Sequence, residues 1–276
     1  MLRAGPLALI AATSLITAGC VELGVVSDGT SVSLGKPGNG KIASGVRLPD
    51  RGAGYFTRER WRERNNRYGT DELVGLIQAV AKRVHASARE PRLVVADLSG
   101  RGGGPVHTWP RSHPSGRDVD LVYFMLDQDG KPIEAETMYE LAPDGTALDG
   151  SGLRIDIART WRLVKELVTA HEATVQFVFM YGPFAELLAE HATRIGEPAP
   201  LIARARKAMR QPGDSAPHND HIHVRIYCPA ADRAFGCQDS GPLDLLVERE
   251  AELAAMDAAS RNAPVDAITP ALPPSS

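Results

Sequence analysis

The segment at residues 218–229, HNDHIHVRIYCP, decides how we expect the chain to fold. Across residues 221–227 polar and apolar side chains alternate strictly, and this period predicts a half-buried strand. Side chains two positions apart share one face of a strand. One face should therefore point into a core through Ile222, Val224 and Ile226. The other face should present His221, His223 and Arg225.

The run at residues 112–120, SHPSGRDVD, follows the same logic earlier in the chain. A turn at residues 114–116 leads into a predicted apolar strand over residues 118–126. This places Asp120 on a sheet and lets the preceding loop bring His113 towards it. Asp118 has two interpretations: it belongs to the site, or it is a carboxylate that only supports a ligand or faces solvent.

Together the two runs supply three ligands for one zinc site: His113, Asp120 seven positions later, and a histidine of the distant pair His221-x-His223. Three protein ligands leave the fourth tetrahedral position open for water or substrate, which is typical of a catalytic zinc rather than a structural one. A lone histidine on a strand is more often a surface or hydrogen-bonded residue. Here, however, three of the eight histidines fall within residues 218–223, and such clusters favour a metal site.

These motifs resemble those of a known family. Gly102-Gly103-Gly104, the run at residues 112–120 and the later His-x-x-His-x-His-Val-Arg with Cys-Pro-Ala are similar to the penicillin-insensitive murein endopeptidases. That family belongs to a superfamily with lysostaphin-type enzymes, D-Ala-D-Ala metallopeptidases and the hedgehog amino-terminal domain. The resemblance extends over roughly residues 39–237. The joint motif carries it, since either half alone would be weak evidence.

The resemblance implies the same zinc ligands, His113, Asp120 and His223. It also implies that His221 is a catalytic residue beside the metal and that His218 lines the same site. Some relatives have a histidine three residues before the first ligand, where this chain has Pro110, and His107 is out of register with that position. A second metal ion has no convincing ligand set in the sequence.

The sequence leaves three candidates for the general base: His221, His218 and Asp220. The sequence contains no His-Glu-x-x-His helix to supply the usual glutamate. Strand alternation argues against Asp220, which should point away from His221 unless the strand begins after it. We therefore favour His221. Arg225 is expected to be structural or to contact a substrate carboxylate.

Composition agrees with one catalytic domain of the α+β class. The chain has 276 residues, is 43% hydrophobic and carries a net charge of −3. Helical periodicity follows Thr70 and recurs over residues 157–170, 184–195 and 201–209, between the predicted strands. We expect a central antiparallel sheet that carries the zinc ligands and is flanked by helices.

No nucleic-acid partner is expected, because no large basic patch stands out. The arginine-rich run at residues 58–67 is interrupted by Glu59 and Glu63, which is typical of a solvated helix face. The expected partner is peptidoglycan, through its cross-linked stem peptides.

The amino terminus predicts export to the periplasm. Residues 1–19 are interpreted as a signal peptide, since the apolar run at residues 7–16 is too short to span a bilayer. Small residues directly before Cys20 resemble a lipoprotein cleavage site, and lipidation there would anchor the protein to the outer membrane. The alternative is an ordinary cleaved signal with an incidental cysteine.

The rest of the chain divides into four parts. We expect a flexible tether at residues 20–45, the catalytic domain at 46–241, a helix at 242–260 and a disordered Ala/Pro-rich tail at 261–276. In an exported protein, Cys228 and Cys237 are expected to form a disulfide.

The predicted function is zinc-dependent hydrolysis of peptidoglycan cross-links. By resemblance the bond is D-alanyl to meso-diaminopimelyl, and the enzyme is insensitive to β-lactams because it has no serine nucleophile to acylate. Two alternatives stay open: a D,D- or L,D-carboxypeptidase that trims stem peptides, and a peptidoglycan-binding lipoprotein that holds zinc without turnover.

Overall fold

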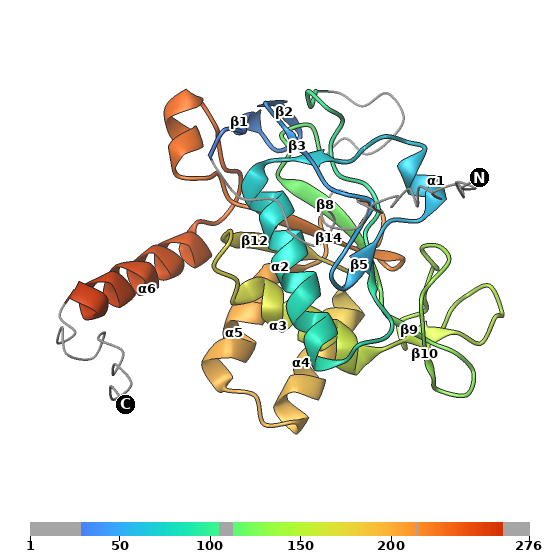
Figure 1. Ribbon diagram of the computed structural model, residues 1–276. Helices are drawn as coiled ribbons and strands as arrows, with labels where there is room; N and C mark the ends of the chain where they lie inside the picture. Colours follow the sequence, from blue (N-terminus) through green and yellow to red (C-terminus); the bar gives the residue numbers. More distant parts are fainter. Residues whose placement is uncertain (1–28, 105–112, 214, 262–276) are drawn as a thin grey trace, which may run out of the picture.

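A four-stranded sheet carries both motif segments (Figure 1). The computed structural model describes residues 29–104, 113–213 and 215–261. The strand order in this sheet is β13 (Met209–Arg210), β12 (Val175–Phe179), β14 (His221–Ile226) and β8 (Asp118–Val122). β14 pairs antiparallel with both neighbours, as expected, whereas the short edge strand β13 is parallel to β12.

The alternation predicted for β14 is confirmed. Ile222 and Val224 are fully buried and Ile226 is 1% exposed, so these three side chains form one face inside the core. The strand register then fixes the opposite face, because His223 lies opposite Asp120 of β8 and opposite Phe179 of β12. The two halves of the predicted zinc motif are therefore side by side in adjacent strands.

Four helices pack next to one another and contribute to the same hydrophobic core as the sheet (Figure 1). They are α2 (Asp71–Ser87), α3 (Ile157–Val168), α4 (Gly182–Arg194) and α5 (Ala199–Ala208). The first two begin at side-chain caps: Thr70 accepts a hydrogen bond from the backbone of Leu73, and Asp156 accepts one from Arg159. All four predicted helices are present, and the fold is α+β.

Short strands extend around this centre in several small sheets. They are β1 (Val32–Lys36), β2 (Asn39–Ala43), β3 (Val46–Arg47), β4 (Arg51–Gly52), β5 (Tyr55–Phe56), β6 (Tyr68–Gly69), β7 (Leu93–Val94), β9 (Met125–Leu126), β10 (Pro132–Ile133) and β11 (Arg154–Ile155). The remaining helices are α1 (Glu59–Arg62), the 3-10 turn η1 (Ala231–Phe235) and α6 (Asp244–Arg261). The single strand expected over residues 118–126 is divided into β8 and β9.

The prediction of a flexible tether at residues 20–45 is wrong from Val32 onwards, because β1 and β2 form a hairpin there. The backbone amide of Ser33 donates to Asp232 and its hydroxyl donates to the carbonyl of Ser115, so the hairpin is fixed to the domain. Small residues here permit close packing: a Cβ added to Gly40 would lie 2.8 Å from the Ser115 Cβ. The glycine and serine content therefore reflects contact, not flexibility.

Several expectations about the chain ends fall outside the described residues: the signal peptide at 1–19, Cys20 and the tail from 262. The expected C-terminal helix is present as α6, which projects away from the sheet (Figure 1). The Cys228–Cys237 disulfide is present, as predicted. Within the described ranges, no helix has the length and apolar character needed to cross a membrane.

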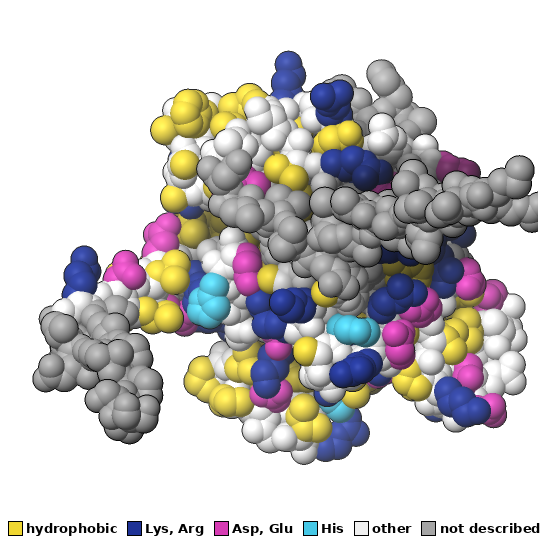
Figure 2. Space-filling model, viewed as in Figure 1, with side chains coloured by type: hydrophobic (Ala, Val, Ile, Leu, Met, Phe, Trp, Pro, Cys, Tyr) yellow, Lys and Arg dark blue, Asp and Glu magenta, His cyan; other side chains and the backbone are white. Residues whose placement is uncertain are grey.

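Basic and acidic side chains are interspersed on the face shown in Figure 2. Several basic side chains of the described residues are paired with carboxylates. For example, Arg83 contacts both Glu166 and Glu172, and Arg92 contacts Glu134. Exposed pairs of this kind contribute little to the free energy of unfolding.

Candidate metal centre

Three predicted ligands converge at the sheet. The Nε2 atom of His113 and the Nδ1 atom of His223 each lie 3.3 Å from Oδ1 of Asp120, and the ligand atoms of all three residues lie within 4.8 Å of one another. A tetrahedral zinc ion with bonds of about 2.05 Å separates its ligand atoms by about 3.3 Å. The three groups therefore have the spacing that zinc requires.

The inward-facing atoms also lack partners that would explain their burial. His113 is fully buried and Asp120 is 5% exposed, yet His113 Nε2 and Asp120 Oδ1 make no hydrogen bond in the described structure. Unpaired buried polar atoms are costly. A cation between these lone pairs would satisfy them, so the donor set fits a zinc ion.

The outward-facing nitrogen of each imidazole is held by the protein. His113 Nδ1 lies 3.2 Å from the carbonyl oxygen of Leu98, and His223 Nε2 lies 2.7 Å from Oδ1 of Asp118. If these nitrogens carry the protons, the other nitrogen of each ring is left as an acceptor facing the centre. Both hydrogen bonds thus select the tautomer that can bind a metal.

Asp118 supports the site and does not face its centre. Its Oδ1 accepts hydrogen bonds from His223 and, at 2.6 Å, from Arg225 Nε. Burial disfavours its charged form, but Arg225 and His223 more than offset this and lower the pKa of Asp118 to about 2. Of the two interpretations left by the sequence, the geometry favours a carboxylate that orients a ligand.

The charge states of two of the predicted ligands, His223 and Asp120, suit metal binding. Burial lowers the pKa of His223 to about 4, despite its hydrogen bond to Asp118, so this imidazole is neutral near pH 7. The pKa of Asp120 is lowered because the surrounding histidines outweigh the effect of its burial. A neutral imidazole and a carboxylate are the forms that coordinate zinc.

His221 stands next to the ligands with its own carboxylate partner. Its Nε2 lies 3.5 Å from Asp120 Oδ1, and its Nδ1 lies 2.6 Å from Asp220 Oδ1. Burial lowers its pKa, but Asp120 and Asp220 more than compensate, so the net shift is upward. Because β14 begins at His221, Asp220 precedes the strand and alternation does not turn it away.

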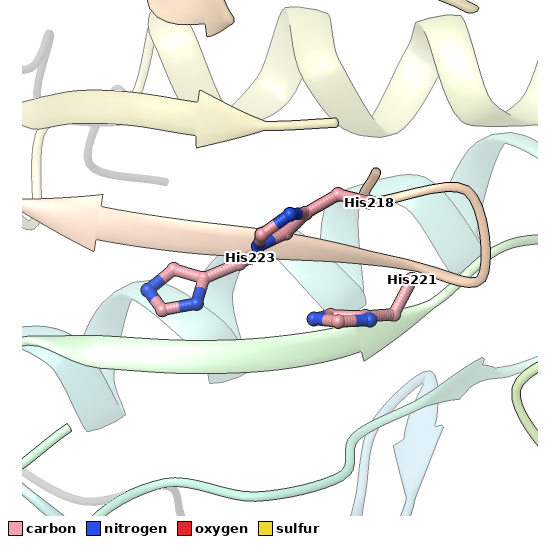
Figure 3. A group of neighbouring side chains, drawn as sticks. All are labelled: His218, His221 and His223. Carbon is pink, nitrogen blue, oxygen red and sulfur yellow. The ribbon is translucent and has the colours of Figure 1, made fainter. Parts of the chain in front are cut away.

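His218 completes a cluster of imidazoles around the start of β14 (Figure 3). Its ring centroid lies 5.0 Å from that of His221 and 6.0 Å from that of His223. Its backbone is anchored on both sides: the amide donates to Gln211, and the carbonyl accepts from the hydroxyl of Tyr123. These three histidines, which the sequence already shows as a cluster, also offer ligand atoms within 4.8 Å of one another, and this group shares His223 with the first.

The sequence missed several groups that position the ligand His113 and the neighbouring His218. The carbonyl of Leu98, the side chain of Gln211 and the hydroxyl of Tyr123 carry no motif. The glycine run does have a structural signal: Gly103 has φ of 64°, and an added Cβ would lie 2.0 Å from the carbonyl oxygen of Pro114, next to His113. His107, Pro110 and Ser112 lie outside the described residues.

Comparison with known proteins identifies the family of the chain. The profile of the family described as penicillin-insensitive murein endopeptidase matches residues 33–270. The chain belongs to this family. A penicillin-insensitive murein endopeptidase of Haemophilus influenzae is 27% identical over 223 residues, covering 78% of this chain and 70% of the relative. One from Klebsiella pneumoniae strain 342 is 26% identical over 219 residues, covering 78% and 72%.

The match to the penicillin-insensitive murein endopeptidase family indicates which segments of the chain form the family domain. The matched residues begin within β1 and extend through α6. The hairpin at the amino end and the loop closed by Cys228 and Cys237 therefore belong to the family domain rather than to appended segments.

Proposed function

We propose that the protein is a zinc-dependent murein endopeptidase that hydrolyses D-alanyl–meso-diaminopimelyl cross-links of peptidoglycan in the periplasm. The observation that supports this most directly is the buried triad of His113, Asp120 and His223, in which His113 Nε2 and Asp120 Oδ1 lie at zinc spacing and make no hydrogen bond within the described residues. Family membership supplies the substrate class. The lipid anchor at Cys20 stays a prediction from the sequence.

His113, Asp120 and His223 would hold the ion, and three protein ligands would leave a coordination position for water or substrate. When bound there, zinc lowers the pKa of a water molecule and polarises the scissile carbonyl. Asp118 and the Leu98 carbonyl would keep the two imidazoles in the correct tautomer and orientation.

His221 would act as the general base. Its Nδ1 proton is engaged by Asp220, so Nε2 is the nitrogen free to accept a proton from the attacking water and return it to the departing amine. Its raised pKa favours this acceptance. His218, at the edge of the same cluster, would line the site; its Nδ1 lies 3.3 Å from the carbonyl oxygen of Ala216, so in its neutral form it presents Nε2 as an acceptor.

Digestion of purified, cross-linked sacculi tests the proposal. The zinc-loaded protein should convert dimeric muropeptides to monomers, and EDTA should stop the conversion. His191→Ala, which changes a histidine on α4 away from the centre, is the matched control and should behave like the wild type. Release of free D-alanine with unchanged dimers would instead indicate a carboxypeptidase, and bound zinc with no release of either product would indicate a binding protein.

A further inference from the structure

The metal-bearing sheet carries a single row of side chains that extends from the centre to its edge. The register places Asp120 opposite His223, His223 opposite Phe179, and Phe179 opposite Arg210. Residues paired in this way point to the same face of a sheet. Arg210 of β13 therefore lies on the catalytic face, two strands from His223, or about 10 Å at the usual strand spacing of about 4.8 Å.

The space between His223 and Arg210 is covered by two phenylalanines, Phe177 and Phe179, which we call the aromatic shelf. Their rings are stacked with centroids 4.6 Å apart, and Phe179 meets the His223 ring edge-on at 5.4 Å. The guanidinium of Arg210 lies over Phe177, 5.7 Å from the ring centroid. The shelf thus begins at a zinc ligand and ends at a positive charge.

The two arginines on this sheet differ in whether a carboxylate neutralises their charge. Arg225 is paired with Asp118 and is 13% exposed, so its charge is already neutralised. Arg210 is exposed, and among the described residues it forms no ion pair. Its one side-chain hydrogen bond runs from Nε to the carbonyl of Lys207 at 3.0 Å, which orients the guanidinium and leaves both terminal nitrogens available.

We infer that Arg210 binds a carboxylate of the stem peptide about 10 Å from the scissile bond, and that this peptide passes over Phe179, the partly exposed member of the aromatic shelf, since Phe177 is only 7% exposed. This inference rests on the proposed function and names a specificity-determining residue for it. An extended peptide advances about 3.4 Å per residue, so the carboxylate belongs about three residue lengths from the cleaved bond. A preoriented guanidinium is well suited to a carboxylate because it can donate two parallel hydrogen bonds.

The test compares two substrates: a purified cross-linked muropeptide dimer with free stem carboxylates, and the same dimer with those carboxylates amidated. For the wild type, amidation should raise KM about 10-fold and leave kcat within about 2-fold, as expected for loss of one charge-assisted contact. Arg210→Gln should raise KM for the free dimer to the same extent and no longer distinguish the two dimers. Arg210→Lys should retain part of the preference.

Arg194→Gln, an arginine at the end of α4, is the matched control and should keep the wild-type preference. Zinc content should be equal in all four proteins, which separates substrate binding from damage to the neighbouring Gln211–His218 contact. If Arg210→Gln still favours the free dimer as strongly as the wild type does, the inference is wrong while the proposed function stands. A wild-type protein that cleaves neither dimer would overturn both.

Discussion

Asp220 and His221 are neighbours in sequence, and their side chains are also in contact, with Asp220 Oδ1 2.6 Å from His221 Nδ1. The opposite ring nitrogen, Nε2, lies 3.5 Å from Asp120. A carboxylate behind an imidazole fixes its tautomer and raises its basicity. This pair is the arrangement expected of a general base that is not itself a zinc ligand.

Replacing His221 should therefore separate catalysis from metal binding. His221→Ala should keep one zinc per chain and lower kcat by about 10²–10⁴-fold, the usual contribution of a general base. Zinc content by atomic absorption and muropeptide release from sacculi are the measurements. Loss of zinc in this variant would mean that His221 is a ligand.

Asp220→Asn should produce a milder defect of the same kind. An amide can still contact Nδ1 but does not stabilise a protonated imidazole, so kcat should fall about 10–100-fold with zinc content unchanged. The acidic limb of the pH profile of kcat should also move to lower pH, because Asp220 is one of the groups that raise the pKa of His221. A profile that does not move would assign Asp220 a purely structural role.

Removing zinc should lower thermal stability, because the ion binds a site that the unfolded chain lacks. At a free zinc concentration about 100 times the dissociation constant, the ion adds about 2.7 kcal/mol to the free energy of unfolding. Calorimetry should show a higher Tm with zinc than with EDTA for the wild type, and no such difference for His113→Ala. The control His191→Ala should respond as the wild type does.

Asp118 and Asp120 illustrate what the sequence can and cannot predict. Period-two alternation predicted that both carboxylates share one strand face, and it likewise placed His223 and Arg225 together on β14. Which carboxylate faces the metal depends on the register between the two strands. That register sets His223 opposite Asp120 and Arg225 opposite Asp118, and no local pattern encodes it.

Two further differences between the predictions from sequence and the structure have identifiable causes. The role of Asp220 depends on where β14 begins, and strand boundaries are poorly determined by alternation. The hairpin at Val32–Ala43 was mistaken for a tether because glycine and serine permit both flexibility and close backbone contact. In the second case the deciding contacts, with Ser115 and Asp232, are distant in sequence.

The register also predicts the effect of Asp118→Asn. The variant keeps a side chain of the same shape but loses the negative charge shared by His223 and Arg225. Zinc affinity should fall about 10–100-fold, the usual effect of altering a group that supports a ligand. Competition with a fluorescent zinc chelator measures it, and an affinity equal to that of the wild type would show that the negative charge of Asp118 is not needed to position His223.

Glu72 gives a prediction that is independent of the metal. It lies in the first turn of α2, and its Oε2 is buried without a hydrogen-bond partner in the described structure. Burial, followed by the nearby carboxylates of Asp71 and Asp232, raises the pKa of Glu72 to about 7. The folded state therefore holds this proton more tightly than the unfolded chain, in which the pKa of a glutamate is about 4.3.

The sign of the pH dependence follows from this difference. The stabilising contribution of protonated Glu72 is fully present below about pH 4.3 and is lost as the pH rises through about 7. Glu72→Gln cannot ionise, so relative to the wild type it should gain about 1–2 kcal/mol in the free energy of unfolding between pH 5 and pH 8, after allowance for partial exposure. Urea unfolding at the two pH values measures the gain. Glu63→Gln, at an exposed position, should show no comparable change, and an equal gain in both variants would mean that overall charge, not the site of Glu72, is responsible.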